Sequence, residues 1–250
     1  MWKSVIFSIR VLGGITIAVC LIFALLDNKT KNSFAQEHEV ELPDIREFVR
    51  MAFIHGTPYK EVIRYEPAAT TSILLELLRD PDFRAARAQI ATTLGMLGDR
   101  RAIGPLIQLA EEGDGELSPT DYNAKTGAIG ALGLALNREM DRRAFDYLTG
   151  LANMNSKSID KLKWTSPYQA DLDDRNTEIS RTAIIALALS GQKEAEIFLD
   201  SLRQKDLRPA LSAEMKNSLN ATMKDALITN RVIQQGGKDG LKNYFNKETK

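Results

Sequence analysis

The chain has 250 residues, with 33 basic and 33 acidic side chains and a sequence pI near 6.8. Four of the basic residues and one acidic residue lie in the first 35 positions, so the rest carries a net charge near −3. This balance argues against a body attracted to nucleic acid or to an anionic lipid surface. The single cysteine, Cys20, lies in the same N-terminal segment, so the remaining chain has no disulfide and no thiol chemistry.

The N-terminal segment, residues 1–35, is expected to direct export. Val11 to Leu26 is an uncharged apolar run that follows two basic residues, and Ser-Phe-Ala at 33–35 offers a small-x-small cleavage site. The run is long for a signal peptide but short of the roughly 20 residues of a spanning helix, so an uncleaved anchor over residues 4–26 is the alternative. Both readings place the body in the periplasm or outside the cell, touching a membrane only through an uncleaved segment.

Residues 42–80 are expected to form the first pair of helices. Asp44–His55 carries apolar residues at helical spacing, and Ala68–Arg79 does the same before Asp80-Pro81 ends the pattern. Terminal units of a repeat protein are usually atypical, so we interpret this pair as a degenerate first unit.

One pattern then occurs three times. A first helix has apolar or small residues at i, i+4, i+7, i+8 and i+11, and a second helix carries Ala, Leu and Leu in register. The equivalent residues Ala102, Ala144 and Ala195 are 42 and 51 residues apart. Because a helix with one apolar stripe cannot bury it alone, stacked pairs are expected. The sequence predicts an all-α protein, an α-solenoid of about four to five helical hairpins. The expected units are 42–80, 82–112, 121–152, 175–204 and 207–235.

Small residues on the first helices predict close approach between neighbouring pairs. Glycine costs about 1 kcal/mol relative to alanine inside a helix, so close packing would offset that cost. The positions are Ala91, Gly95, Gly130, Gly133, Ala186 and Ala188.

This pattern resembles the HEAT-like repeats, particularly the short type found in phycobilisome lyases and many bacterial scaffold proteins. The match is clearest in residues 84–102, which read like the family's R-x-x-A-x-x-A-L-G-x-x-G-D-x-x-A with Thr93 in place of Ala. Later copies depart, since Asn137–Met140 adds four residues and Gln192 replaces the Asp. The resemblance covers residues 71–204. It implies a fold but no activity, because the shared residues are core and cap positions.

Two insertions join successive pairs, at Gly113–Asp121 and Asn153–Asp174, and equivalent junctions should emerge on the same edge. The longer one carries Trp164 and Tyr168. Loops of this length inside a compact domain are usually functional or disordered. The two aromatic residues could anchor a partner protein, or could simply pin the loop onto the helices.

Residues 236–250 are expected as a polar C-terminal tail. Pro209–Gln235 reads as one long helix or two shorter ones, which Gly236-Gly237 ends. An apolar cluster in the tail, Leu241 with Tyr244 and Phe245, could fold back as a cap.

Basic residues recur where successive second helices begin. They could form a basic strip for an acidic partner segment, or could be solvated helix starts neutralised by Asp99 and Asp141. They are Arg100, Arg101, Arg142, Arg143 and Lys193.

No catalytic residue, metal site or cofactor is predicted. His38 and His55 stand apart, without the spacing of a zinc or nucleophile motif. The acidic cluster Asp171, Asp173 and Asp174 lacks the Gly and the distal Glu of a calcium loop, and is interpreted as the cap of the next helix.

The sequence therefore predicts an exported, non-enzymatic scaffold that binds another protein, of unknown identity, through a groove and the insertion loops. One alternative, implied by the resemblance, is a bilin-lyase-like protein acting on a chromophore-bearing protein, although that chemistry belongs inside the cell. The other is a self-associating structural protein of the envelope.

Overall fold

In the computed structural model, residues 42–250 form one compact unit. The described part is almost entirely helical, which confirms the predicted all-α class. Within it, no helix combines the length and the apolar character needed to cross a bilayer. The predicted export segment, residues 1–35, and its alternative anchor, residues 4–26, lie outside the described residues. The structure describes residues 41–54, 56–154, 156–169, 171–204 and 211–248.

The described elements follow one another in chain order, with short 3₁₀ helices marked η. They are α2 (Ile45–Phe48), α3 (Tyr59–Val62), α4 (Pro67–Leu77), η1 (Pro81–Ala86), α5 (Arg87–Leu97), η2 (Arg100–Ala102), α6 (Ile103–Glu111), β1 (Gly115–Glu116), α7 (Pro119–Arg138), α8 (Arg142–Ala152), α9 (Ser156–Ile159), β2 (Trp164–Thr165), α10 (Leu172–Leu189), α11 (Lys193–Gln204), α12 (Ala213–Gln235), η3 (Gly237–Asp239) and α13 (Gly240–Glu248).

The helix expected over residues 44–55 is wrong beyond its first turn, because α2 ends at Phe48. The chain folds back there instead of continuing. The ring of Phe48 lies 5.1 Å from that of Phe53 and 5.5 Å from that of Tyr65. The Tyr65 hydroxyl donates a 2.8 Å hydrogen bond to the carbonyl of Pro43. Aromatic contacts between non-adjacent segments therefore override the local helical pattern.

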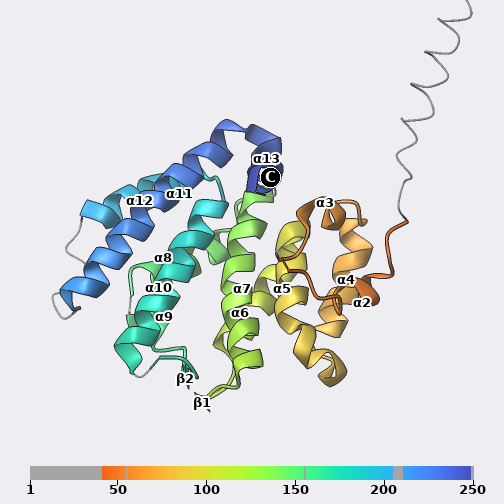
Figure 1. Cartoon of the computed structure of the whole chain (residues 1–250), viewed down its shortest axis with the longest axis horizontal. Coiled ribbons are helices and arrows are strands. Elements are labelled where there is room, and N and C mark those ends of the chain that lie inside the picture. Colours follow the sequence, from red (N-terminus) through yellow and green to blue (C-terminus); the bar gives the residue numbers. More distant parts are fainter. Residues whose placement is uncertain (1–40, 55, 155, 170, 205–210, 249–250) are drawn as a thin grey trace, which may run out of the picture. The chain divides into compact units, whose positions relative to one another are not determined.

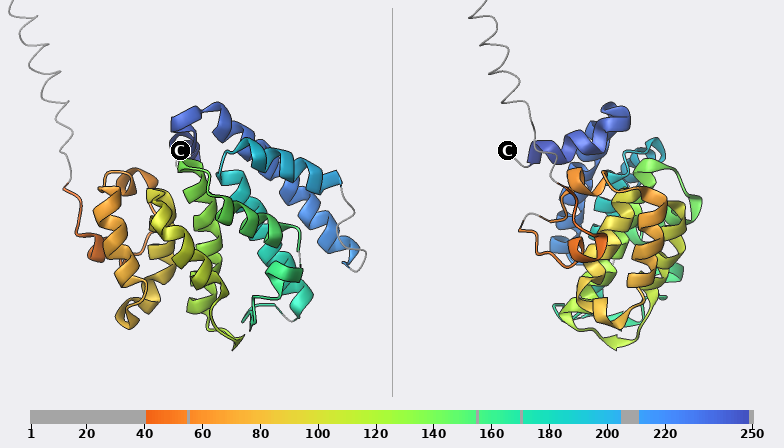
Figure 2. Two further views of the ribbon diagram at one scale, coloured as in Figure 1. Left: turned by 180° about the vertical axis from the view of Figure 1, so that it is seen from behind. Right: turned by 90° about the vertical axis from the view of Figure 1, so that its right-hand side faces the viewer.

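Four long helices, α5, α7, α10 and α12, are called the first helices, and they pack in sequence order (Figure 1). Helix α7 lies between α5 and α10, and α10 lies between α7 and α12. The second helices α6, α8 and α11 each contact the first helix of the following pair, namely α7, α10 and α12. Figure 2 shows the same elements from behind and from the side. Each apolar stripe is thus covered by more than one neighbour.

The equivalent positions of the three copies are all buried, as the repeat pattern predicts. On the second helices these are Ala102, Leu106, Leu109, Ala144, Leu148, Leu151, Ala195, Leu199 and Leu202. On the first helices they include Ile90, Leu94, Ala128, Leu132, Ala183 and Leu187.

Two glycines set the closest approach between first helices. A Cβ on Gly95 would lie 2.5 Å from the carbonyl oxygen of Ala131, and one on Gly133 would overlap the carbonyl group of Ala186. These two positions confirm the expected close approach. Gly130 does not, because a Cβ there would meet nothing within 4 Å. The helices α5, α7 and α10 are therefore in backbone contact at the glycines.

The C-terminal segment is more ordered than the expected polar tail. Helix α12 is a single helix, and residues 237–248 continue as η3 and α13. Leu241 is buried, and the ring of Phe245 stacks on that of Tyr59 with centroids 5.4 Å apart. Helix α13 thus contacts α3, near the opposite end of the described chain.

Candidate functional site

The two insertions meet on one edge of the domain, as expected from equivalent junctions. We call the described residues of 113–118 and 153–171, with the first turns of α7 and α10, the insertion edge. Strands β1 and β2 form a short parallel pair there, with Gly115 opposite Trp164 (Figure 1). The amide of Leu117 donates a 3.2 Å hydrogen bond to the carbonyl of Thr165. The shorter insertion therefore holds the longer one.

Trp164 anchors the longer insertion inside the domain. Its side chain is 0% exposed, and its indole N–H donates a 2.9 Å hydrogen bond to the carbonyl of Ala110 at the end of α6. The ring of Tyr122, on α7, meets the indole edge to face at 6.0 Å. Trp164 cannot reach a partner without unfolding of the loop, so its assignment as a contact residue is wrong and the pinning interpretation holds for it.

Lys125 is a buried cation beside this indole. It is 3% exposed, and its Nζ donates hydrogen bonds to the carbonyls of Leu109, at 2.9 Å, and of Glu112. These carbonyls belong to the C-terminal end of α6, where backbone acceptors lack helical partners and cations are favoured. Burial lowers the pKa of the ammonium group, which nearby Glu112 partly offsets. Nζ lies 6.0 Å from the Trp164 ring, at the outer limit of a cation–π contact.

Arg175, on α10, holds the insertion from the other side. Its Nη1 donates to the carbonyls of Leu162, at 2.7 Å, and of Trp164, at 2.5 Å. Its Nε and Nη2 both donate to Oδ1 of Asn176. The guanidinium carbon lies 5.5 Å from the centre of the Trp164 ring. Two buried cations therefore face one indole and bind the backbone around it.

Lys125 and Arg175 were not among the residues predicted from the sequence, although the position of Lys125 in the repeat could have indicated its role. Lys125 directly follows the buried Ala124, and its equivalent in the next copy is Ser180. The Ser180 hydroxyl donates a 2.7 Å hydrogen bond to the carbonyl of Ala152 at the end of α8. A polar donor at this position thus caps the preceding second helix in both copies. A lysine next to the buried alanine stripe could therefore have been predicted to cap α6.

Tyr168 differs from Trp164, because its side chain is 60% exposed. Its ring contacts the ring of Tyr122 edge to face at 5.4 Å, and its amide donates to Oγ of Ser166 at 3.0 Å. Leu172, four residues on, is 56% exposed. The pinned loop therefore presents two large side chains to solvent, and Tyr168 remains a candidate contact residue.

A pocket of about 320 Å³ lies between the loop, α10 and the start of α12, and Gln169, which directly follows Tyr168, is in its lining. We call it the edge pocket. Thr177 lines it, is only 4% exposed, and its hydroxyl has no hydrogen-bond partner among the described residues. The Oε1 atom of Gln169, also in the lining, is buried without a partner in the same part of the chain. Buried polar groups are normally paired, and these two are among the exceptions in the described part of the chain. Other lining residues are Asp174, Glu178, Arg181 and Met215.

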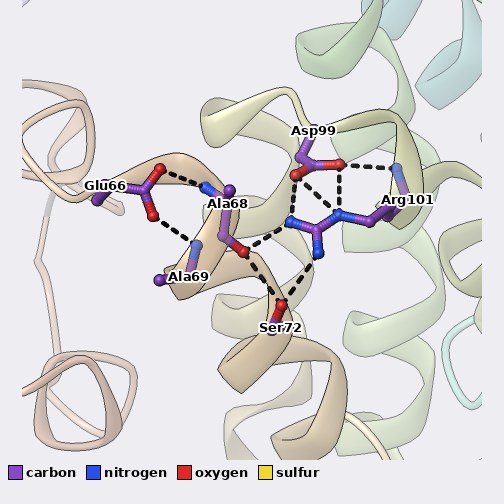
Figure 3. Close-up of polar contacts among 6 residues, drawn as sticks. All are labelled: Glu66, Ala68, Ala69, Ser72, Asp99 and Arg101. Carbon is purple, nitrogen blue, oxygen red and sulfur yellow. Dashed lines mark hydrogen bonds and ion pairs between the residues drawn. The ribbon is translucent and has the colours of Figure 1, made fainter.

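The arginines at the helix starts are held in local ion pairs. Figure 3 shows Arg101 between Asp99 and the start of α4. Its Nη2 lies 2.6 Å from Oδ2 of Asp99 and donates to the carbonyl of Ala68 at 2.6 Å, while Nη1 donates to Oγ of Ser72 at 3.0 Å. The hydrogen bonds from Arg101 hold the pKa of the Asp99 carboxyl below its usual value. Glu66 caps the same helix α4.

The second copy repeats the arrangement. Asp141 caps α8, and its carboxylate lies 3.2 Å from Arg143 and 3.6 Å from Arg100 of the preceding copy. Arg142 pairs with Asp146 at 3.0 Å. All four arginines thus have carboxylate partners, which favours neutralised helix starts over a basic strip.

The acidic cluster acts as the predicted cap. Oδ1 of Asp171 accepts a 2.8 Å hydrogen bond from the amide of Asp174 at the start of α10. No group of three or more His, Cys, Asp or Glu side chains suited to a metal ion is found among the residues described. His38 and His55 lie outside those residues. Comparisons with protein families, curated proteins and solved structures find no match for the chain.

Proposed function

We propose that this chain is an exported, non-enzymatic scaffold, and that its insertion edge binds another protein. We further propose that the domain is a HEAT-like α-solenoid. Two observations support that architecture: the first helices contact one another in sequence order, and equivalent residues of the three copies are buried. A stack of this kind offers continuous edges, on which insertions from different units lie side by side.

The observation that carries the binding proposal is the contrast between Trp164 and Tyr168. Trp164 is fixed in the interior, whereas Tyr168 and Leu172 of the same insertion are exposed. A rigid aromatic side chain loses little conformational entropy when a partner covers it. Tyrosine is also among the residues that contribute most to protein interfaces.

A capture experiment with matched variants tests the proposal. The full-length protein, tagged at its C-terminus, is expressed in its native host and recovered from gently solubilised envelope after mild cross-linking. We expect Tyr168→Ala with Leu172→Ala to remove specific captured proteins. The control variant is Ile197→Ala with Ile228→Ala, which removes two exposed apolar side chains on α11 and α12. If the edge variant and the control retain the same proteins, the insertion edge is not the contact surface.

Export has its own measurement. The intact mass of the protein recovered from the native envelope distinguishes cleavage after Ala35 from an intact N-terminus. Recovery of the protein only from the cytosolic fraction would contradict export.

A further inference from the structure

The edge pocket has an excess of negative charge. Asp174, Glu178 and Glu214 supply three carboxylates, against the single guanidinium of Arg181. That guanidinium is already engaged, because its Nη1 pairs with Glu178 and its Nη2 donates to Oγ of Ser218 at 2.8 Å. No ion pair joins Asp174 or Glu214 to another residue in the described ranges. A cation entering the pocket would therefore meet unneutralised carboxylates.

The unpaired groups also favour a ligand that donates hydrogen bonds. Oε1 of Gln169 can only accept, and carboxylates can only accept when ionised. The hydroxyl of Thr177, which has no partner, can accept one as well. A guanidinium group offers five N–H donors in a plane and no acceptor, so it complements this set better than a neutral or anionic group does.

The helix N-termini beside the pocket do not reverse this preference. The start of α10 is capped by Asp171, and the start of α12 by Ser212, whose Oγ accepts from the amide of Met215 at 3.2 Å. With these backbone donors partly satisfied by side chains, the attraction of the helix ends for anions is reduced.

The surroundings of the pocket suit a side chain carried by a peptide. Met215, in the lining, can cover the aliphatic stem of a long side chain, and Tyr168, directly before Gln169 in the chain, is exposed to a partner. We propose that the edge pocket binds an arginine side chain from a segment of the partner protein, with Gln169, Thr177, Asp174 and Glu214 as its hydrogen-bonding and charge partners. This inference rests on the proposed function and specifies the chemistry of the partner.

A peptide titration tests this chemistry directly. The full-length protein, labelled with ¹³C at its methionine methyl groups, is purified in a non-ionic detergent and studied by NMR. The methyl signal of Met215 is assigned by its absence from the spectrum of Met215→Leu. The probe is a blocked Gly-Ser-Arg-Ser-Gly peptide. Two counterparts carry citrulline, which keeps the shape but loses the charge, or glutamate. We expect a saturable shift of the Met215 signal with a dissociation constant of about 1 mM, and at least about tenfold weaker binding of the citrulline peptide.

Two sets of variants locate the interaction. Asp174→Asn with Glu214→Gln should weaken binding of the arginine peptide about tenfold, whereas the charge-matched control Asp146→Asn with Glu194→Gln should leave it unchanged. Thr177→Val should weaken binding about threefold to tenfold without lowering the melting temperature, because the lost hydroxyl has no intramolecular partner.

The proposal is overturned if the citrulline or glutamate peptide binds as tightly as the arginine peptide, or if no peptide shifts the Met215 signal. It is equally overturned if the Asp174/Glu214 variant binds like the wild type. If the peptide titration gives one of these results but the Tyr168/Leu172 variant loses captured proteins, the insertion edge is still a binding surface, but its partner does not insert an arginine. Binding of the peptide without that loss would instead contradict the proposed function.

Discussion

The two edges of the domain are held together by different means. At the turn edge, where a first helix passes to its second helix, exposed arginines pair with capping aspartates, as Arg143 does with Asp141. At the insertion edge, Lys125 and Arg175 are buried and donate to backbone carbonyls around Trp164. Exposed ion pairs usually contribute less than about 1 kcal/mol, whereas removing a donor from a buried carbonyl costs about 1–3 kcal/mol.

This contrast separates residues that recur in equivalent positions of the copies from residues that hold one particular loop. The Asp-x-Arg pattern occurs where two second helices begin, and in both the aspartate caps the helix. Lys125 and Arg175 fix one particular loop in one place. The residues that do not repeat therefore distinguish the insertion edge from the turn edge.

The largest effect is expected from Trp164→Ala. The change leaves a cavity under the insertion and an unpaired carbonyl at Ala110, so the free energy of unfolding should fall by about 3–5 kcal/mol. Urea denaturation followed by circular dichroism measures this. Tyr168→Ala, which removes an exposed ring, serves as the control and should cost less than about 1 kcal/mol. Equal losses in the two variants would contradict the burial of Trp164.

Lys125→Met keeps the aliphatic stem and removes the buried cation. The carbonyls of Leu109 and Glu112 then lose their donor, and the free energy of unfolding should fall by about 1–3 kcal/mol. Lys161→Met is the matched control, since Lys161 is exposed and pairs with Glu111 at the surface. A control variant as unstable as Lys125→Met would show that burial of the Lys125 ammonium group does not set its contribution to stability.

Asp141→Ala measures how much a helix cap at the turn edge contributes to the free energy of unfolding. Its carboxylate accepts hydrogen bonds from the amides of Arg143 and Ala144, so losing the cap should cost about 1–2 kcal/mol. Asp146→Ala on the same helix removes only an exposed partner of Arg142 and should cost less than about 0.5 kcal/mol. Thermal unfolding of both variants distinguishes the cap from the ion pair.

The smallest effect is a dependence on pH at Asp121, at the start of α7. Hydrogen bonds from Arg84 hold the pKa of this carboxyl at about 2, below its ordinary value. The folded state then binds fewer protons than the unfolded state, so the stabilisation is present above pH ~4 and is lost as the pH falls toward ~2. Asp121→Asn should therefore unfold more easily than the wild type at pH 7, with a difference that shrinks toward pH 2. A difference that stays constant across this range would rule out the carboxylate as its source.

The sequence was a good guide to the repeated core. Ala102, Ala144 and Ala195 are all buried, because each lies on the apolar stripe by which its helix packs into the domain. Gln192 shows how a departure from the pattern can be absorbed, since its side chain donates to the carbonyl of Leu136 instead of capping as an aspartate would. The prediction for Gly130 failed because helical spacing alone does not say which glycine faces a neighbour.

The candidate site was less readable, because it depends on contacts between residues far apart in the chain. Trp164 and Tyr168 are four residues apart on one loop, and only the placement of Ala110 and Lys125 decides which ring is buried. The edge pocket is lined by both Gln169 and Met215. Local sequence patterns do not predict that two residues so far apart in the chain lie close together. Burial of a polar hydroxyl such as that of Thr177 leaves no mark in the sequence.

The stacking of Phe245 on Tyr59 has a consequence for how the domain is made. The ring of Tyr59 therefore stays uncovered until residues 240–248 have folded against α3. Repeat proteins whose ends do not touch can fold one unit at a time. Here the contact between α13 and α3 means that α3 is fully packed only after the C-terminal helix has folded. A variant truncated before Gly240 should accordingly be easier for a protease to cut near Tyr59 than the full-length protein.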